Sequence, residues 1–370
     1  PAPRQAAQRA GRQEPAAVPI GRWTKPRADI SDVPAQGSAL QRFFGLKGWS
    51  YVSVSSPRFF VALTPVQFNY VEDVYLSVVD KALGQVVFEY HWQMPFGRSL
   101  RLPPASVDGC MTFADGWTGA VRTELCFVHD HWLWTIDAPD LKAKMTIDKG
   151  EEALILAYPL ANLPTRPAYV HKEAGMRVHG FVELVKRGDR EEIAAGQATG
   201  VLDWTRAWAL RETRWRWTSL SAPAVKVTET SASGEIRSRK ATMGINLSSF
   251  VYDVTAKGGN VTFSSENALW IDHSVFPLNA AAHIEVPADG PLAGPWKITL
   301  SEPGVADLRL TFKPHGLRED HTHLGLVVSD FVQPFGSFSG SISLTLSDGG
   351  RLNLAIVDAY GVCEDHRAVW

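Results

Sequence analysis

The chain has 370 residues, a formal net charge of −2 and an apolar fraction of 45%, so it is long enough for two domains or one large β domain. A charge so close to zero gives no electrostatic basis for binding nucleic acid. The longest uncharged apolar runs, such as 59–71, are short and contain proline, so we expect no transmembrane helix. No signal-peptide segment is visible either.

Residues 1–40 form a segment rich in Pro, Ala and Arg. Before Asp29 it has a single acid, Glu14, and six basic residues: Arg4, Arg9, Arg12, Arg22, Lys25 and Arg27. We interpret it as an extended basic arm that contacts a protein partner or is the remnant of an organelle-targeting segment, with a disordered leader as the alternative. A targeting remnant would place the protein inside the cell, in the mitochondrion or another organelle.

Residues 41–200 have the pattern of a β domain. Two apolar stretches within 68–92 flank the turn sequence DKALG and predict a hairpin. Alternating apolar and polar residues predict further strands within 121–136, 144–158 and 176–186. No amphipathic helix longer than one or two turns is apparent.

The three cysteines, Cys110, Cys126 and Cys363, are odd in number and scattered along the chain. They match neither a metal-binding spacing nor a disulfide framework. We therefore expect reduced thiols in an intracellular protein.

Residues 200–221 contain four of the thirteen Trp residues. From Leu210 onward the pattern has period two, which places Trp215 and Trp217 on one strand face and Arg214 and Arg216 on the other. The Trp face needs a core or a pocket, and the Arg face needs water or carboxylates.

Residues 201–370 continue the β pattern as a second domain. The clearest hairpin is 342–357, where apolar alternation continues on both sides of the turn Asp348-Gly349-Gly350. Many short strands at hairpin spacing are typical of sandwiches and barrels. We predict an all-β protein with two antiparallel barrel or sandwich domains, 41–200 and 201–370.

Indole rings that line a cavity bind apolar ligands or stabilise a carbocation through the ring face. We therefore predict a ligand site formed by Trp204, Trp215, Trp217, Trp270, Arg206 and Arg214. Asp203, next to Trp204, would donate a proton or hold a water molecule. The alternative is a set of core Trp residues stacked on Arg, with a structural Asp.

Further candidate acids lie in two other segments. In the tail segment 361–367, an extended chain places Glu364 and His366 on one face, as an acid/base pair would require. The alternative is an ion-pair network in which Asp365 binds the arginines of 214–216. In 270–273, Asp272 follows Trp270 within an apolar strand and would need a partner such as Arg.

Two H-x-H sequences, 129–131 and 321–323, would place paired imidazoles on one strand face, which suits zinc or iron. No third ligand is identifiable, and ordinary surface histidines are the alternative. We assign no metal site and no cofactor.

Five strings resemble the family called domain of unknown function 2804 over about 43–370: FGLKGW (44–49), VLDWTR (201–206), TRWRW (213–217), ALWID (268–272) and GVCEDHR (361–367). That family is similar in style to two-domain lipocalin-like proteins that include carotenoid hydratases and tocopherol cyclases. The resemblance implies two barrel-like domains that face each other around an apolar cavity. In those enzymes an acid protonates an isoprenoid alkene. The resemblance gives that role to Asp203 or Asp272, with an aromatic wall of Trp204, Trp215 and Trp270.

We therefore expect a protein that binds a hydrophobic isoprenoid or lipid, with cofactor-independent hydratase, cyclase or isomerase activity as the catalytic form of this hypothesis. The alternative is a non-catalytic accessory or scaffold subunit of a larger assembly, anchored through residues 1–40. An open Trp-lined cavity with a buried acid favours the first hypothesis. Barrels filled by their own side chains favour the second.

Overall fold

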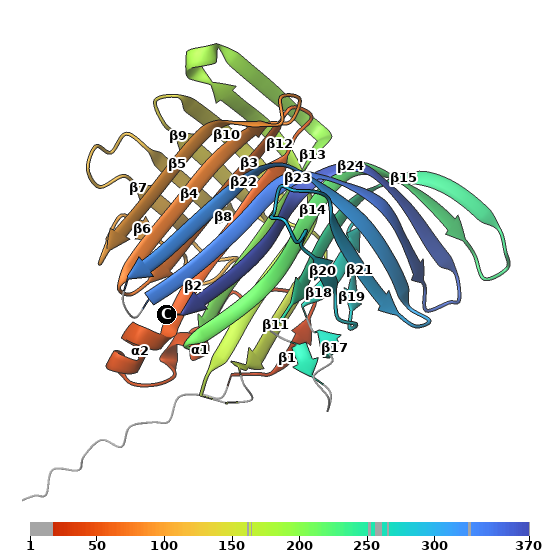
Figure 1. Ribbon diagram of the computed structural model, residues 1–370, viewed down its shortest axis with the longest axis horizontal. Helices are drawn as coiled ribbons and strands as arrows, with labels where there is room; N and C mark the ends of the chain where they lie inside the picture. Colours follow the sequence, from red (N-terminus) through yellow and green to blue (C-terminus); the bar gives the residue numbers. More distant parts are fainter. Residues whose placement is uncertain are drawn as a thin grey trace, which may run out of the picture.

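The computed structural model describes residues 18–160, 163, 165–250, 253–255, 261–264, 266–324 and 327–369. These residues form two large antiparallel sheets with very little helix, which confirms the all-β prediction (Figure 1). Among the described residues, no helix has the length and apolar character needed to cross a membrane.

The first sheet contains the strands between Gly21 and Trp208. Its spatial order is β5 (Gln85–Pro95), β4 (Val71–Asp80), β3 (Phe59–Phe68), β2 (Leu46–Ser55), β13 (Asp189–Trp208), β12 (Pro167–Leu184), β10 (Leu141–Asp148), β9 (His131–Asp137), β8 (Arg122–Val128), β7 (Cys110–Ala114) and β6 (Leu100–Arg101). Beside this path, β11 (Leu154–Pro159) pairs with β12 and with β1 (Gly21–Trp23). The hairpin predicted within 68–92 is formed by β4 and β5.

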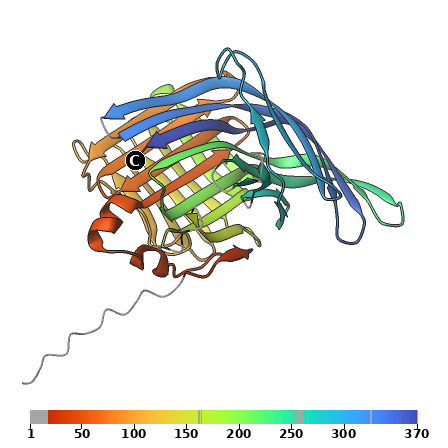
Figure 2. The same cartoon turned by 60° about the horizontal axis from the view of Figure 1, so that its bottom comes forward.

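The second sheet has the order β19 (Ser274–Leu278), β18 (Asn267–Ile271), β15 (Ile236–Ser249), β14 (Glu212–Thr230), β24 (Arg351–Val369), β23 (Val327–Thr345), β22 (Ala306–Leu324), β21 (Trp296–Glu302) and β20 (His283–Glu285). A separate pair is formed by β16 (Asp253–Thr255) and β17 (Val261–Ser264). The first sheet is curled, β22, β23 and β24 lie across it, and the far ends of the long hairpins project away (Figures 1 and 2).

The chain passes from one sheet to the other between Trp208 and Glu212, so the boundary expected at residue 200 falls inside β13. The described part of the predicted arm, 18–40, lies against the first sheet. There β1 pairs with β11, and Trp208 Nε1 donates a hydrogen bond to the carbonyl of Val33 in the short helix α1 (Asp32–Ala35). Helix α2 (Ala39–Gly45) follows, with a capping box between Ser38 and Gln41. Residues 1–17 lie outside the described part.

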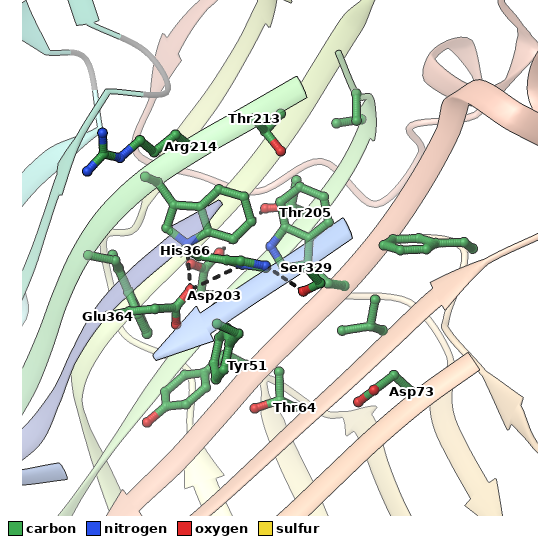
Figure 3. Close-up of a pocket in the computed structure, with 18 of the residues that line it drawn as sticks. Tyr51, Thr64, Asp73, Asp203, Thr205, Thr213, Arg214, Ser329, Glu364 and His366 are labelled. Carbon is green, nitrogen blue, oxygen red and sulfur yellow. Dashed lines mark hydrogen bonds and ion pairs between the residues drawn. The ribbon is translucent and has the colours of Figure 1, made fainter. Parts of the chain in front are cut away.

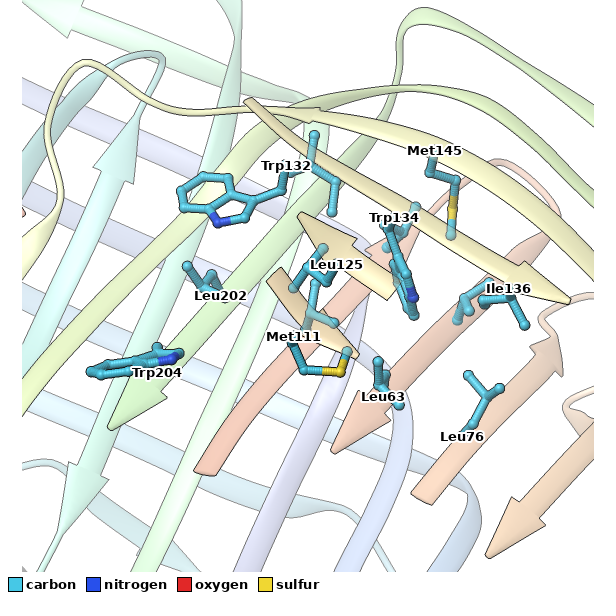
Figure 4. Packing of buried hydrophobic residues seen from close by; sticks show 14 of the residues in the cluster. Leu63, Leu76, Met111, Leu125, Trp132, Trp134, Ile136, Met145, Leu202 and Trp204 are labelled. Atoms are coloured by element: carbon cyan, nitrogen blue, oxygen red, sulfur yellow. The ribbon is translucent and has the colours of Figure 1, made fainter. Parts of the chain in front are cut away.

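Each sheet has its own apolar core, and a third cluster packs the sheets together. In the first core, Trp132, Trp134 and Trp204 are buried (Figure 4). The third cluster combines residues of both sheets, among them Tyr51 and Trp217, whose rings lie 5.0 Å apart edge to face. The sheets therefore share a continuous buried interface.

The expectation of three reduced thiols is wrong for one pair. Cys110 in β7 and Cys126 in β8 are directly opposite in the ladder, with their Cα atoms 4.0 Å apart, and they form a disulfide. Their spacing of 16 residues reveals no such pairing until the register of the two strands is known. Cys363 is a buried free thiol.

Candidate functional site

A cavity of about 340 Å³ is formed where the two sheets meet. Its wall is largely apolar and includes the aromatic side chains of Trp49, Tyr51, Phe68, Tyr70, Trp215, Trp217, Phe250 and Phe331. Polar and charged groups are set among them: Asp73, Lys172, Asp203, Glu266, Arg318, Gln333, Glu364 and His366. An apolar wall with a few converging polar groups is the usual composition of a small-molecule site.

The alternation of β13 decides which of its residues reach the cavity. Asp203 and Thr205 face it, whereas Trp204 and Arg206 project from the opposite side of the sheet. Trp204 belongs to the first core, and the Arg206 side chain lies over Gly48. The two residues predicted to accompany Asp203 therefore do not line the cavity.

Strands β14 and β24 bring together the other predicted residues. Trp215 and Trp217 on β14 face the cavity, as do Glu364 and His366 on β24. On the opposite face, Asp365 pairs with Arg216 at 3.0 Å and with Arg214 at 4.0 Å. The structure therefore has the ion pairs expected of Asp365 on one face, and on the other it places Glu364 and His366 together, as the acid/base hypothesis requires. Arg214 reaches the cavity edge, but its guanidinium points away from Asp203 and Glu364, the acids that face the cavity (Figure 3).

Glu364 is a buried carboxyl group that faces the cavity. Trp215 Nε1 donates to its Oε1, and Gln333 Nε2 donates to its Oε2 at 2.8 Å. Burial raises the pKa of Glu364 to about 7, and these hydrogen bonds together with the charge of Arg318 lower it only in part. Near neutral pH, a large fraction of the Glu364 carboxyl group is therefore protonated.

His366 is next to Glu364 and is held as a neutral imidazole. Its Nε2 lies 3.0 Å from Ser329 Oγ, and its Nδ1 lies 3.9 Å from Glu364 Oε1 (Figure 3). Its ring packs edge to face on Trp215, with centroids 4.2 Å apart. Burial lowers the pKa of His366 to about 3, so its imidazole is a weak base and stays unprotonated at neutral pH.

Asp203 forms a buried ion pair with Lys172. Lys172 Nζ on β12 contacts Asp203 Oδ2 and lies 3.2 Å from Glu266 Oε1, which belongs to the second sheet's side of the cavity. Burial opposes the charge on Lys172, but the two carboxylates outweigh it and raise its pKa. Burial also raises the pKa of Glu266 to about 7. The three groups form a buried polar floor.

Arg318 on β22 provides a second cation in the wall. Its guanidinium carbon lies 3.8 Å from the ring centre of Tyr75 and 4.6 Å from that of Phe331. Its Nη1 donates to Thr64 Oγ1 at 3.3 Å. Sequence reasoning missed Arg318, Lys172 and Glu266. The sequence does contain one signal for Lys172: the charged pair Lys172-Glu173 interrupts the otherwise largely apolar run 168–176, as a buried ion pair would.

The remaining predicted residues, Asp272 and Trp270, lie elsewhere, at a second cavity of about 220 Å³. Strand β18 ends at Ile271, and Asp272 has a positive φ of 55°, so the strand alternation does not extend to it. Its carboxylate binds Arg239, the kind of partner predicted for it. Trp270 Nε1 donates to the carbonyl of Glu152.

The two H-x-H sequences differ in structure. His129 has a positive φ in the turn between β8 and β9, so 129–131 does not present two imidazoles on one strand face. His321 and His323 do share a face of β22, and each places a ring nitrogen close to the same oxygen of Asp330, at 3.2 and 3.0 Å.

Comparison with known proteins gives a family but no activity. The model of the family described as domain of unknown function (DUF2804) matches residues 9–370. No curated protein matches the chain. Among solved structures, the chain is similar to CghA with Sch210972, at 10% identity over 95% of this chain and 98% of that chain, with a TM-score of 0.47. It is also similar to kievitone hydratase from Nectria haematococca, at 12% identity over 94% and 97%, with a TM-score of 0.42. With a family model that matches nearly its whole length, the chain belongs to the DUF2804 family.

Proposed function

We propose that this protein binds a hydrophobic small molecule, an isoprenoid or a lipid, in the cavity between its sheets and catalyses its hydration, cyclisation or isomerisation by proton transfer. The observation that carries the proposal is Glu364, a carboxyl group with its pKa raised to about 7 that faces an aromatic wall. The cavity volume of about 340 Å³ is within the range of small-molecule sites.

The proton transfer is assigned to Glu364 and not to Asp203. Glu364 is held by two neutral donors, Trp215 and Gln333, whereas Asp203 is bound to the cation of Lys172. A neutral carboxyl group in an apolar site is the usual form of a general acid at pH 7.

The reaction balances without a redox partner. The Glu364 proton and the π electrons of an alkene form a new C–H bond, which leaves a carbocation on the neighbouring carbon. An indole face such as that of Trp215 stabilises a nearby cation by about 2 kcal/mol when dry. Water, a second alkene or loss of a proton then completes hydration, cyclisation or isomerisation. The Glu364 carboxylate left by the first step accepts the proton released.

The scaffold hypothesis has less support. Residues 18–40, the described part of the predicted anchoring arm, pack on the protein's own first sheet. A Trp-lined cavity with a buried acid favours ligand binding over a purely structural role.

Native mass spectrometry of gently purified protein tests binding. We expect an added mass of roughly a few hundred daltons, one small-molecule ligand, that dissociates on activation. Trp215→Ala should lose it and Trp117→Ala should retain it, because Trp117 is 80% exposed. Loss in both variants, or only protein chains as added mass, would contradict the proposal.

Solvent labelling tests the chemistry on the extracted ligand class. In deuterated water the wild type should place one deuterium on carbon in the product, because the Glu364 proton exchanges with solvent. Glu364→Gln should bind the ligand and reduce turnover by about 10²- to 10⁴-fold. Unchanged turnover in that variant would remove Glu364 from the mechanism and leave the binding function standing.

A further inference from the structure

Three side chains converge at the rim of the cavity, where the edge of the first sheet meets β22. They are Asp73 of β4, His91 of β5 and Asp320 of β22. One potential ligand atom from each lies within 4.8 Å of those from the other two. Asp73 and Asp320 both line the cavity.

The strand register explains this convergence. Asp73 is directly opposite Gln93, and His91 is opposite Tyr75, so Asp73 and His91 are diagonal neighbours on one face of the hairpin. His91 Nε2 lies 3.1 Å from Asp73 Oδ2. Asp320 reaches the same place from the second sheet.

Each carboxylate is oriented by a neighbour that binds only one of its oxygens. Gln93 Nε2 donates to Asp73 Oδ2 at 3.1 Å, and Thr322 Oγ1 donates to Asp320 Oδ1 at 3.2 Å. Within the described part of the chain, the buried Asp73 Oδ1 accepts no hydrogen bond. Hydrogen bonds that orient ligating carboxylates are a regular feature of metal sites.

We propose that Asp73, His91 and Asp320 form a site for a divalent transition metal such as Zn²⁺, Mn²⁺ or Co²⁺. One imidazole with two carboxylates is a donor set that these ions accept, and three protein ligands leave a coordination position for water or a ligand oxygen. Two adjacent ligand atoms each about 2.1 Å from a metal lie about 3.0 Å apart in octahedral geometry and about 3.4 Å apart in tetrahedral geometry. His91 Nε2 and Asp73 Oδ2 form a hydrogen bond, and their separation of 3.1 Å lies within this range.

The charge of Arg318 limits the affinity of the site. Arg318 packs on the Tyr75 ring, and that ring lies 6.1 Å from the His91 ring. A guanidinium this close offsets part of the charge of the two carboxylates. We therefore expect an exchangeable ion and not a closed structural zinc. Because the ligands come from both sheets, the ion would tie the sheets together at the wall of the cavity, whether or not Glu364 transfers a proton.

The alternative location within the described residues is His321, His323 and Asp330. Here both imidazoles compete for a single oxygen of Asp330, which is the only carboxylate within hydrogen-bond distance of either ring among the described residues. They therefore serve as the internal comparison.

Calorimetric titration of metal-stripped full-length protein with Zn²⁺ or Mn²⁺ tests the site, with Co²⁺ absorption as a second readout. We expect one equivalent to bind. Asp320→Asn should weaken binding by more than about tenfold, whereas Asp320→His, which restores a ligand at the same position, should bind Co²⁺ with a shifted spectrum. The double variant His321→Gln/His323→Gln should bind like the wild type. Absence of metal uptake by the wild type, or loss of uptake in the double variant alone, would overturn the proposal.

Discussion

Glu364 and Asp203 line the same cavity, but their surroundings give the two carboxyl groups different properties. Glu364 receives hydrogen bonds from neutral groups, and burial raises its pKa to about 7. Asp203 is held against the buried ammonium group of Lys172. A proton donor and a fixed negative charge can therefore coexist in one site.

The raised pKa of Glu364 predicts a pH-dependent difference in stability between the wild type and Glu364→Gln. The folded state binds this proton more tightly than the unfolded state, so the wild type loses stability as pH rises from about 4.5 through about 7. Glu364→Gln lacks this loss, because its oxygen still accepts from Trp215 and the amide of Gln333 can flip to accept. Relative to the wild type, the variant should gain about 3 kcal/mol across that range, at about 1.4 kcal/mol per pKa unit.

Urea denaturation on both sides of pH 7 measures this difference. His366 acts in the opposite direction, because its pKa is lowered to about 3 and its stabilising contribution is lost as pH falls below 6.5. His366 is present in both proteins, so its effect largely cancels in the comparison. A stability difference that does not change with pH would show that Glu364 is ionised throughout.

Arg318 predicts selectivity for ligands with an anionic end. Arg318→Met keeps apolar packing on Tyr75 but removes the charge. Fluorescence titration should show that the variant binds anilinonaphthalene sulfonate several-fold more weakly than the wild type and binds neutral N-phenylnaphthylamine equally well. Equal weakening of both probes would instead indicate a loss of cavity shape.

At the scale of strands, the sequence predicts turns and faces better than pairings. The turn at 348–350 and the two faces of 214–217 follow from local alternation, and the structure has both. The pairing of β14 with β24, which places Trp215 opposite His366, joins segments about 150 residues apart and has no local signal. Trp204 and Arg206 were misplaced because neighbouring residues of a strand face opposite sides.

The crossing of β12 and β15 gives a prediction about glycine. A Cβ atom on Gly244 of β15 would overlap Ala174 of β12, so the two sheets approach closely only because this position has no side chain. Gly244→Ala should destabilise the protein by about 1–3 kcal/mol through overpacking. Gly294→Ala is the matched control, because open space surrounds that position. Similar melting temperatures for both variants would show that the sheets can move apart without cost.

At the scale of the whole molecule, the cavity belongs to neither sheet alone. Its acids, cations and aromatic rings come from both, so no single segment of the sequence contains the site. The sequence therefore predicted two β domains and several of the cavity residues, but not Lys172, whose role depends on two partners distant in the sequence.

Lys172 forms buried ion pairs with Asp203 and Glu266 where the two sheets meet. We therefore predict that this contact makes a pH-dependent contribution to the free energy of unfolding. Lys172→Met leaves Asp203 and Glu266 buried without their cation, and breaking a buried pair in this way costs about 3–5 kcal/mol. Protonation of Glu266, whose pKa burial raises to about 7, relieves part of this cost, so the destabilisation should be larger above pH 7 than below it. The triple variant Lys172→Met/Asp203→Asn/Glu266→Gln removes all three charges and should recover most of the loss. If the single and triple variants unfold at the same urea concentration at every pH, the loss of stability comes from packing around Lys172. The balance of charge between Lys172, Asp203 and Glu266 would then not be what stabilises the contact between the sheets.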